Sequence, residues 1–260
     1  MNSFPDPKVA FVTGAAQGLG LGITQHLLST GWKVMLFDLD ADAGDEAITA
    51  LPEEQQERAL FFKGDIANEH DVAIAVQQTV DRFGRIDGLV NNAGIADPHS
   101  GSFEHLDWEG WQRVINVNLG GAFLAAKHAT QHLRKTRGAI VNIASTRAFQ
   151  SEPNTEAYAA SKGGMVALTH AMAVSLSGAV RVNAIAPGWI EVGDWQKSSA
   201  REEPQHRDID RQQHPAGRIG TPDDIAKMVA FLLDHEQSGF MTGETIRIDG
   251  GMTHKMIYAD

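Results

Sequence analysis

Short apolar segments alternate with longer amphipathic segments along almost the whole chain, and this alternation restricts the fold more than any other feature of the sequence. The apolar segments, which we expect to be buried strands, are residues 8–13, 33–38, 59–64, 88–91, 139–145, 180–186 and 245–249. The amphipathic segments, which we expect to be helices, lie near residues 20–29, 41–50, 69–83, 108–134, 156–177 and 222–233. Strands separated by helices pair in parallel, because each crossover helix returns the chain to the same edge of the sheet. The pattern predicts an α/β fold with a mostly parallel, seven-stranded sheet that carries helices on both faces.

The composition sets limits on what such a fold can do. The 260 residues and the hydrophobic content of 42% suit one domain with a sizeable core, and no linker divides residues 1–260. Cysteine is absent, which excludes disulfides and thiolate metal sites, and we predict no other metal site. The net charge of −11 argues against nucleic acid as a partner. No segment has the length and hydropathy of a membrane span, and residues 1–7 do not resemble a signal peptide, so we expect a cytoplasmic protein.

One polar segment interrupts the alternation. Residues 191–218 are rich in charge and have no clear apolar period. A long insertion of this kind in a compact domain is usually a lid or a binding loop. We therefore expect residues 191–218 to form a substrate-binding lid within the single domain.

A glycine-rich turn follows the first predicted strand and opens a helix. It reads Thr-Gly-Ala-Ala-Gln-Gly-Leu-Gly over residues 13–20, with glycines at Gly14, Gly18 and Gly20. Glycines in such a turn let the backbone approach a pyrophosphate, which then lies at the helix N-terminus. A glycine triplet by itself is a weak signal, and an ordinary glycine turn is the alternative. Its place between a strand and a helix favours a dinucleotide site.

The end of the second predicted strand indicates which dinucleotide binds. Asp38 ends that strand, and a carboxylate there can accept hydrogen bonds from both adenosine ribose hydroxyls while repelling a 2′-phosphate. Gln17 is neutral where a basic residue would attract that phosphate. A helix N-cap is the alternative role for Asp38. Together the two residues predict NAD rather than NADP as the coenzyme.

Tyr158 and Lys162 are four residues apart on a predicted helix, which places both side chains on one face. A fixed ammonium beside a phenol favours the phenolate, so we expect Lys162 to lower the pKa of Tyr158. The ordinary pKa of tyrosine is ~10, and a lowered value would let the phenol exchange protons near neutral pH. The pair could also be two unrelated helix residues. As a functional pair, it predicts a group that protonates a carbonyl oxygen or deprotonates an alcohol.

Several further motifs occur in the same order along the chain and complete a resemblance to the classical short-chain dehydrogenase/reductase (SDR) family over essentially the whole length. They are Asp65-Ile66, Asn-Asn-Ala-Gly at 91–94, Asn118 within Asn-Val-Asn-Leu, Ser145 after the fifth strand, and Pro-Gly-Trp-Ile at 187–190. The resemblance implies a three-layer, doubly wound Rossmann-like fold. It also implies that the coenzyme is held by Gly14, Gln17, Gly18, Leu19, Gly20, Asp38, Leu39, Asp65, Ile66, Asn92, Ala93, Gly94, Tyr158, Lys162, Pro187, Gly188 and Ile190.

The same resemblance implies four catalytic residues. Tyr158 is expected to be the general acid/base, and Lys162 to hold the nicotinamide ribose as well as to tune Tyr158. Ser145 is expected to hydrogen-bond the substrate oxygen, and Asn118 to hold a water that links Lys162 to solvent. The implied reaction is hydride transfer between nicotinamide and a substrate carbon. Taken alone, Ser145 could be a strand-end hydroxyl bonded to backbone, and Asn118 a residue at a helix kink.

One position departs from the family's pattern. The family often has a threonine after the Pro-Gly turn that bonds the nicotinamide carboxamide. Glu191 and Val192 occupy that stretch here, so this bond must come from elsewhere or be absent.

Polar residues around the catalytic pair suggest the chemistry of the substrate. Gln150 and three charged residues lie between Ser145 and Tyr158, and two more polar residues follow the fourth strand: Arg147, Glu152, Glu156, Asp97 and His99. Such a rim favours a small polar secondary alcohol, for example a sugar, a polyol or a cyclic alcohol. A 3-oxoacyl thioester reductase of the acyl-carrier-protein type is one alternative, although Asp38 and the negative net charge argue against it. A dinucleotide-binding sensor without turnover is the other, although it would not need the full catalytic set.

The helix that carries Tyr158 also suggests self-association. Residues 157–177 contain one formal charge, Lys162, among small and apolar side chains. A helix that is apolar nearly all round must be covered on its outer face as well. We expect the same helix of a second subunit to cover it, with Ala160, Gly163, Gly164 and Ala167 at the contact, in a homotetramer as in the family. Coverage by the chain's own lid is the alternative.

Overall fold

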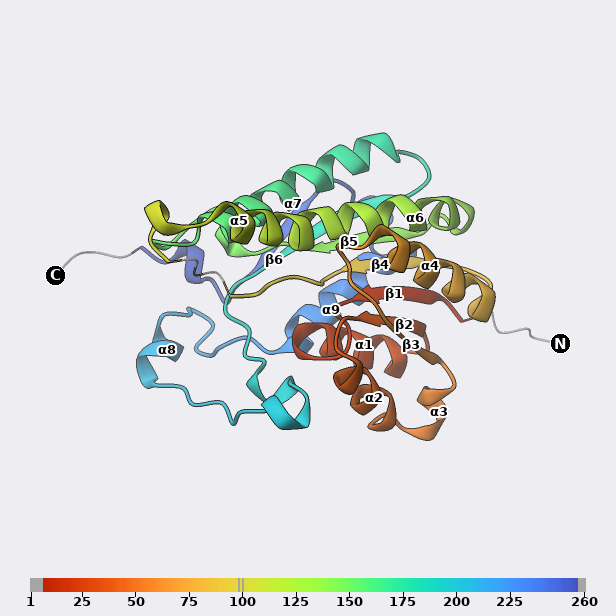
Figure 1. The fold of residues 1–260 in the computed structure, drawn as a ribbon, viewed down its shortest axis with the longest axis horizontal. Helices are drawn as coiled ribbons and strands as arrows, with labels where there is room; N and C mark the ends of the chain where they lie inside the picture. Colours follow the sequence, from red (N-terminus) through yellow and green to blue (C-terminus); the bar gives the residue numbers. More distant parts are fainter. Residues whose placement is uncertain (1–6, 98, 100, 257–260) are drawn as a thin grey trace.

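The structure is a computed structural model that describes residues 7–97, 99 and 101–256, and it is built around one seven-stranded sheet (Figure 1). The strand order is β3-β2-β1-β4-β5-β6-β7, and every pair is parallel, so the predicted sheet is confirmed. Residues 1–6 and 257–260, which include most of the segment searched for a signal peptide, lie outside the described residues. The strands are β1 (Val9–Thr13), β2 (Lys33–Asp38), β3 (Ala59–Lys63), β4 (Gly88–Asn91), β5 (Ala139–Ile143), β6 (Arg181–Pro187) and β7 (Thr245–Ile248).

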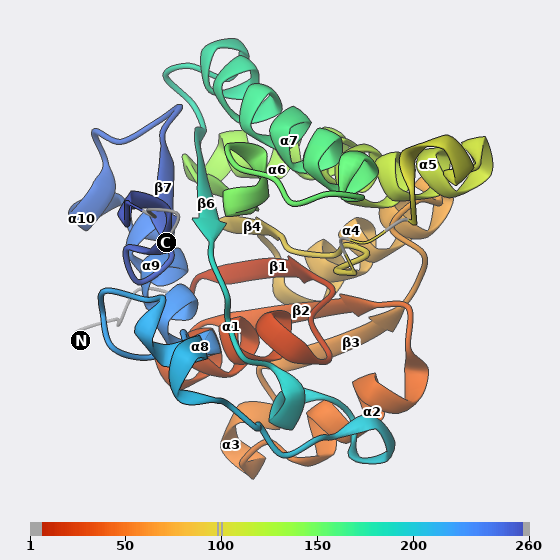
Figure 2. The same cartoon turned by 90° about the vertical axis from the view of Figure 1, so that its left-hand side faces the viewer.

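Helices cover both faces of the sheet, as the doubly wound prediction requires (Figures 1 and 2). One apolar core joins the sheet to α1, α2 and α9, and a second joins it to α4, α6 and α7. The helices are α1 (Gly18–Ser29), α2 (Ala41–Thr49), α3 (Glu53–Gln56), α4 (Glu69–Phe83), α5 (Trp108–Ile115), α6 (Gly121–Thr136), α7 (Glu156–Ser175), α8 (Asp208–Gln212), α9 (Pro222–Leu233) and α10 (His235–Ser238).

The order of the strands locates a crevice. The chain runs from β1 outward to β2 and β3, and then returns to pair β4 with the other side of β1. Ligands of open α/β sheets bind beyond the carboxyl ends of the strands at such a reversal. The glycine-rich turn after β1 and the Asn-Asn-Ala-Gly segment after β4 therefore meet at this point.

The helix predicted over residues 108–134 is interrupted. It consists of α5, a π-helical turn at Asn116–Gly120 and α6. A π-helical turn is often found at a functional site, and this one carries Asn118. The helical period of the sequence does not reveal the interruption, because the chain is α-helical both before and after the π-helical turn.

Short elements were missed for a simple reason. Helices α3, α8 and α10 have four or five residues each, which is too short for a periodic pattern to be recognised. Within the described part of the chain, no helix combines the length and hydropathy needed to cross a bilayer.

Candidate active site

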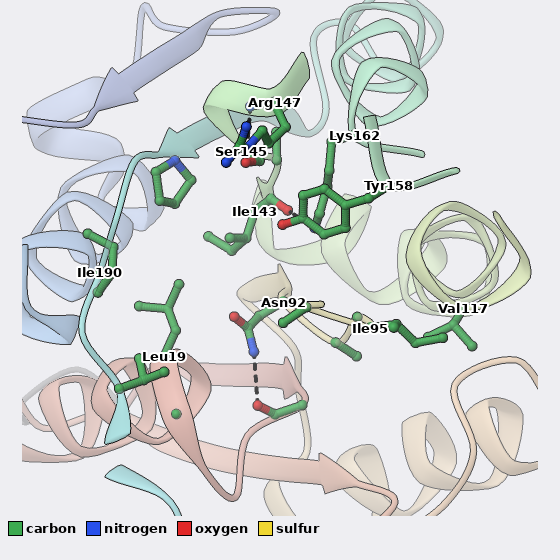
Figure 3. Close-up of a pocket in the computed structure, with 18 of the residues that line it drawn as sticks. Leu19, Asn92, Ile95, Val117, Ile143, Ser145, Arg147, Tyr158, Lys162 and Ile190 are labelled. Atoms are coloured by element: carbon green, nitrogen blue, oxygen red, sulfur yellow. Dashed lines mark hydrogen bonds between the residues drawn. The ribbon is translucent and has the colours of Figure 1, made fainter. Parts of the chain in front are cut away.

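An open cleft of about 1460 Å³ lies at the carboxyl ends of the central strands. It collects almost every residue that the sequence predicted for the site, from Gly14 on the β1 side to Lys162 on α7. Figure 3 shows Leu19 and Asn92 on one side of the cleft and Ser145, Tyr158 and Lys162 on the other. Of the predicted site residues, Gly20 and Asn118 do not line it.

Gly14 is required by the close approach of two loops. Its φ is +61°, in the left-handed region, and a Cβ there would lie 2.8 Å from the Ala93 Cα. Gly18 also has a positive φ and begins α1. A Cβ on Gly20 would overlap the Gly14 carbonyl oxygen. Gly20 therefore lets α1 pack closely against the glycine-rich turn and does not line the cleft.

Thr13 and Asn92 tie the glycine-rich turn to the end of β4. The Asn92 Nδ2 donates to the carbonyl oxygens of Thr13, at 3.0 Å, and Gly14, at 2.9 Å. In return, the Thr13 Oγ1 accepts from the backbone N–H groups of Asn92 and Ala93, both at 3.0 Å. Sequence reasoning treated Thr13 only as the first letter of a motif, although a threonine before the first glycine was the available signal.

Asp38 ends β2 with its side chain almost buried and facing the cleft. One carboxylate oxygen accepts from the Ala16 N–H at 2.9 Å, and the other from the Asp40 N–H at 3.1 Å. The N-cap of α2 is Asp40, whose carboxylate accepts from the Ala43 N–H, so Asp38 is not the cap. Asp38 therefore links β2 to the glycine-rich turn. Further along this side, the cleft is lined by Leu39, Asp65, Ile66, Ala93 and Gly94.

Ser145, Tyr158 and Lys162 converge on the opposite wall from two elements. Ser145 follows β5, and its Oγ accepts from the Arg147 N–H at 3.1 Å as the cap of a short 3₁₀ turn. Tyr158 and Lys162 lie one turn apart on α7, as their spacing predicts (Figure 3). The Lys162 Nζ donates to the Ile143 carbonyl at 2.9 Å and lies 5.6 Å from the centre of the Tyr158 ring.

The electrostatics of this wall differ from the prediction. Burial raises the pKa of Tyr158 above its usual value, while the hydrogen bond with Ser145 and the positive charge of Arg147 act in the opposite direction. Burial also lowers the pKa of Lys162 to about 8, because its ammonium lies within the protein. The expectation that the pKa of Tyr158 is lowered by Lys162 is therefore wrong: loss of solvent outweighs the favourable charges.

Asn118 lies behind the cleft and is fully buried in the π-helical turn. Its Oδ1 accepts from the Ile95 N–H at 2.7 Å, and its Nδ2 donates to the Ile95 carbonyl and to the Ser161 Oγ. Ser161 in turn donates to the Tyr158 carbonyl at 2.8 Å. The chain of bonds joins the β4–α5 loop to the turn of α7 that carries Tyr158. Sequence reasoning missed Ser161, which stands directly before Lys162.

The segment 191–218 is tied both to itself and to α2. The Glu191 carboxylate accepts from the Val192 and Gly193 N–H groups, and its second oxygen lies 2.6 Å from the His206 Nε2. Within this segment, Lys197 pairs with Asp40 at 2.7 Å, and Ser198 bonds to Glu46 at 2.7 Å. In Figure 2 the segment passes beside α2. Residues that line the cleft in this segment or just before it are Val192, Gln196, Pro187, Gly188 and Ile190.

The polar rim predicted near Tyr158 is partly assembled. Arg147 lines the cleft and pairs with Glu152 at 2.5 Å, and Glu152 lies 3.8 Å from the His99 Nε2. Gln150 also lines the cleft. Asp97 and Glu156 do not: Asp97 bonds to the His99 backbone, and Glu156 begins α7.

Comparisons with known proteins place this fold and cleft in a family. The family model described as enoyl-(acyl carrier protein) reductase matches residues 14–253. An uncharacterized oxidoreductase of Thermotoga maritima is 49% identical, over 97% of this chain and 98% of its own. The 2-(S)-hydroxypropyl-CoM dehydrogenase 3 of Xanthobacter autotrophicus is 39% identical, over 95% of this chain and 96% of its own.

Solved structures agree with the sequence relatives. A SCOR enzyme from Clostridium thermocellum superimposes with a TM-score of 0.85 at 39% identity, covering 99% of this chain and 96% of its own. A 3-ketoacyl-(acyl-carrier-protein) reductase from Brucella melitensis, complexed with NADH, gives 0.83 at 32% identity, covering 95% and 98%.

The all-parallel sheet, the glycine-rich turn at its switch point and these relatives define an oxidoreductase that uses a nicotinamide dinucleotide. Its relatives are dehydrogenases and reductases that act on CH–OH groups. The chain belongs to the classical short-chain dehydrogenase/reductase family.

Proposed function

We propose that the protein is an NAD-dependent oxidoreductase that transfers hydride between nicotinamide and a small polar secondary alcohol or its ketone. The observation that carries this proposal is the convergence of Ser145, Tyr158 and Lys162 on the same cleft as the glycine-rich turn. A coenzyme that lay along the turn would bring its reactive end toward these three side chains.

The bound coenzyme would supply or accept the hydride, and the protein's own groups would bind, orient and move protons. Tyr158 accepts the alcohol proton during oxidation and returns it during reduction. Ser145 holds the substrate oxygen by a hydrogen bond, and its hydroxyl favours the ionised form of Tyr158. Lys162, whose pKa burial lowers to about 8, can exchange a proton near neutral pH as well as bond a ribose hydroxyl.

Asn118 has a supporting part in this proposal. Its side-chain amide already bonds to Ile95 and Ser161, so it fixes the α7 turn beneath Tyr158. A water bound by Asn118, as the family resemblance implies, would have to share its Oδ1 or use its backbone.

The preference for NAD rests on the adenosine end of the cleft. A 2′-phosphate there would lie close to the Asp38 carboxylate, with Gln17 as a neutral neighbour. Lys197, a nearby cation, is paired with Asp40. The NADH complex of the Brucella reductase supports the same choice at the level of a relative.

For the substrate, the rim of Arg147, Gln150 and Glu152 offers hydrogen bonds to a polar alcohol. The name of the Xanthobacter relative, a hydroxypropyl-CoM dehydrogenase, agrees with a secondary alcohol. A 3-oxoacyl thioester is the second candidate, because the family model and the Brucella structure both carry acyl-carrier-protein reductase names. In either case, residues 191–218 would act as the lid over the substrate within one domain of residues 1–260.

We also propose a homotetramer in which α7 contacts its copy. Ala160, Ala167 and Val174 are exposed on one side of α7, and a Cβ on Gly163 would meet open space. Gly164 is not part of this surface, because it packs against Leu119 of its own chain. We therefore leave Gly164, one of the four contact residues expected from the sequence, out of the proposed contact.

A turnover panel tests the function. Purified protein is given NAD⁺ or NADP⁺ with sugars, polyols and cyclic alcohols, and in the reverse direction NADH with acetoacetyl-CoA. We expect NADH formation with at least one polar secondary alcohol and its loss in Tyr158→Phe. Tyr258→Phe, at the only other tyrosine of the sequence, is the matched control.

Three results would count against the proposal. Turnover of acetoacetyl-CoA without any alcohol would favour the thioester candidate. Tight NADH binding without turnover of any probe would favour a sensor. Efficient use of NADP⁺ would remove the argument from Asp38.

A further inference from the structure

Arg147 stands two residues after Ser145 and reaches the same end of the cleft as Tyr158. Its backbone N–H donates to the Ser145 Oγ at 3.1 Å, which fixes Ser145 as the cap of the turn that carries Arg147. Its guanidinium lies on the cleft wall, with 24% of the side chain exposed. Figure 3 shows Arg147 and Ser145 together on the same wall of the cleft as Tyr158.

The two cations near Tyr158 differ in kind. Lys162 is buried, bonds to the Ile143 carbonyl and titrates near pH 8. An arginine keeps its charge at every working pH, because its positive charge is delocalised over the guanidinium. A permanent positive charge therefore comes from Arg147, while the charge of Lys162 is lost as the pH rises.

We propose that Arg147 is a positioning residue for the proton transfer: it orients Ser145 through its backbone and stabilises ionised Tyr158 through its guanidinium, and Glu152 moderates that effect by pairing with it. The inference deepens the proposed function and rests on Tyr158 being its acid/base. It assigns to Arg147 the electrostatic part that the sequence argument had given to Lys162.

The contacts around the pair support this assignment. Burial raises the pKa of Tyr158, and the hydrogen bond with Ser145 and then the positive charge of Arg147 act against it. Glu152 bonds to the Arg147 Nη2 at 2.5 Å and brings a negative charge to the same place. The other ionisable side chains that line this end or flank it are Asp97, His99, Glu109, Arg113, Glu156 and Lys162.

The sequence permits a direct test, because it contains only two tyrosines. In a Tyr258→Phe background, Tyr158 is the one phenol, and its ionisation can be followed by the near-ultraviolet absorbance of tyrosinate. Rapid pH jumps give the reading before the chain unfolds. The variants are Arg147→Gln, Arg147→Lys and Glu152→Gln, with Arg134→Gln, at an exposed arginine in the last turn of α6, as control.

We expect the midpoint of the Tyr158 titration to rise by about one pH unit in Arg147→Gln, because removal of a nearby positive charge disfavours the phenolate. It should fall in Glu152→Gln, which frees the arginine charge, and stay near the parent value in Arg147→Lys and Arg134→Gln. In alcohol oxidation, the acidic limb of the kcat/KM profile should move in the same directions.

An unmoved midpoint in Arg147→Gln, or a midpoint that Glu152→Gln raises or leaves in place, would overturn the inference even if activity fell. An equal rise in Arg147→Lys would assign Arg147 a packing role instead. The phenol titration needs no substrate, so a failed turnover panel would not be mistaken for a failure here. Conversely, normal turnover with unmoved midpoints would remove only the role of Arg147.

Discussion

The two halves of the cleft are built in different ways. On the coenzyme half, Thr13, Gly14 and Asn92 are locked together by bonds to backbone groups at the ends of β1 and β4. On the half covered by residues 191–218, the structure depends on side-chain pairs: Lys197 pairs with Asp40 of α2, and His206 pairs with Glu191 within the same segment.

This difference suggests a division of work. Several hydrogen bonds between side chains and backbone at the strand ends are costly to break together, so we expect the coenzyme half to be fixed before any ligand arrives. Pairs between partly exposed charges contribute little and are screened by salt, so the half covered by residues 191–218 can open and close. Tyr158, Lys162 and Ser145 lie where the two halves meet.

The largest effect is expected at that junction. Lys162→Met should lower kcat/KM by about 10³-fold, a typical loss for a group in the proton-transfer step. The same change should alter stability in a way that depends on pH. The pKa of Lys162 is about 8 in the folded protein and near 10.5 when unfolded, so between these values the unfolded chain binds more protons and the parent gains stability as the pH rises.

Urea unfolding at several pH values from 7 to ~10.5 checks this second effect. The parent should gain stability across that window, and Lys162→Met should lack the gain. If the free energy of unfolding depended on pH equally in the parent and in Lys162→Met, the burial of the Lys162 ammonium would be contradicted.

The rigidity of the coenzyme half can be broken at Gly14. In Gly14→Ala, a side chain in the left-handed region would also press on Ala93, so we expect NADH affinity to fall by roughly 10- to 100-fold. Gly31→Ala is the matched control, because its φ is +92° but its Cβ would meet nothing within 4 Å. Calorimetric titration with NADH compares the two, and a similar loss in both would show that backbone strain alone, not the close approach, is responsible.

Coenzyme choice sharpens the comparison further. Asp38→Asn removes the charge while keeping an oxygen for the Ala16 N–H, so the ratio of kcat/KM for NADP⁺ to that for NAD⁺ should rise about tenfold. Asp42→Asn, at an exposed carboxylate in the first turn of α2, should leave the ratio unchanged. If the ratio does not move in Asp38→Asn, discrimination lies elsewhere.

The smallest effect is expected in the segment 191–218. Lys197→Met removes the ion pair with Asp40, and the dissociation rate of NADH should rise roughly two- to fivefold, the range typical of exposed pairs. Stopped-flow displacement at low and high salt measures it, and the difference from the parent should shrink in high salt. Lys227→Met, which removes an exposed pair with Asp223 on α9, is the control. An unchanged rate would show that this contact does not slow the release of NADH.

The same division explains what the sequence could predict. The sheet, the glycine-rich turn and the Tyr158–Lys162 spacing are local patterns, and the structure brings them together as expected. The π-helical turn at Asn118 and the supporting bond from Ser161 depend on contacts between segments that no local pattern links. The direction of the pKa shift at Tyr158 depends on burial, which a residue spacing does not specify.

The central claim is that Tyr158 moves the proton during hydride transfer, and a single-turnover experiment tests it most directly. Enzyme saturated with NAD⁺ is mixed with the best alcohol of the panel, and NADH formation is followed in the parent and in Tyr158→Phe. We predict a rate lower by about 10³-fold in the variant, with an NADH dissociation constant within about twofold of the parent. A variant that binds NADH normally and still forms it within about tenfold of the parent rate would contradict the account.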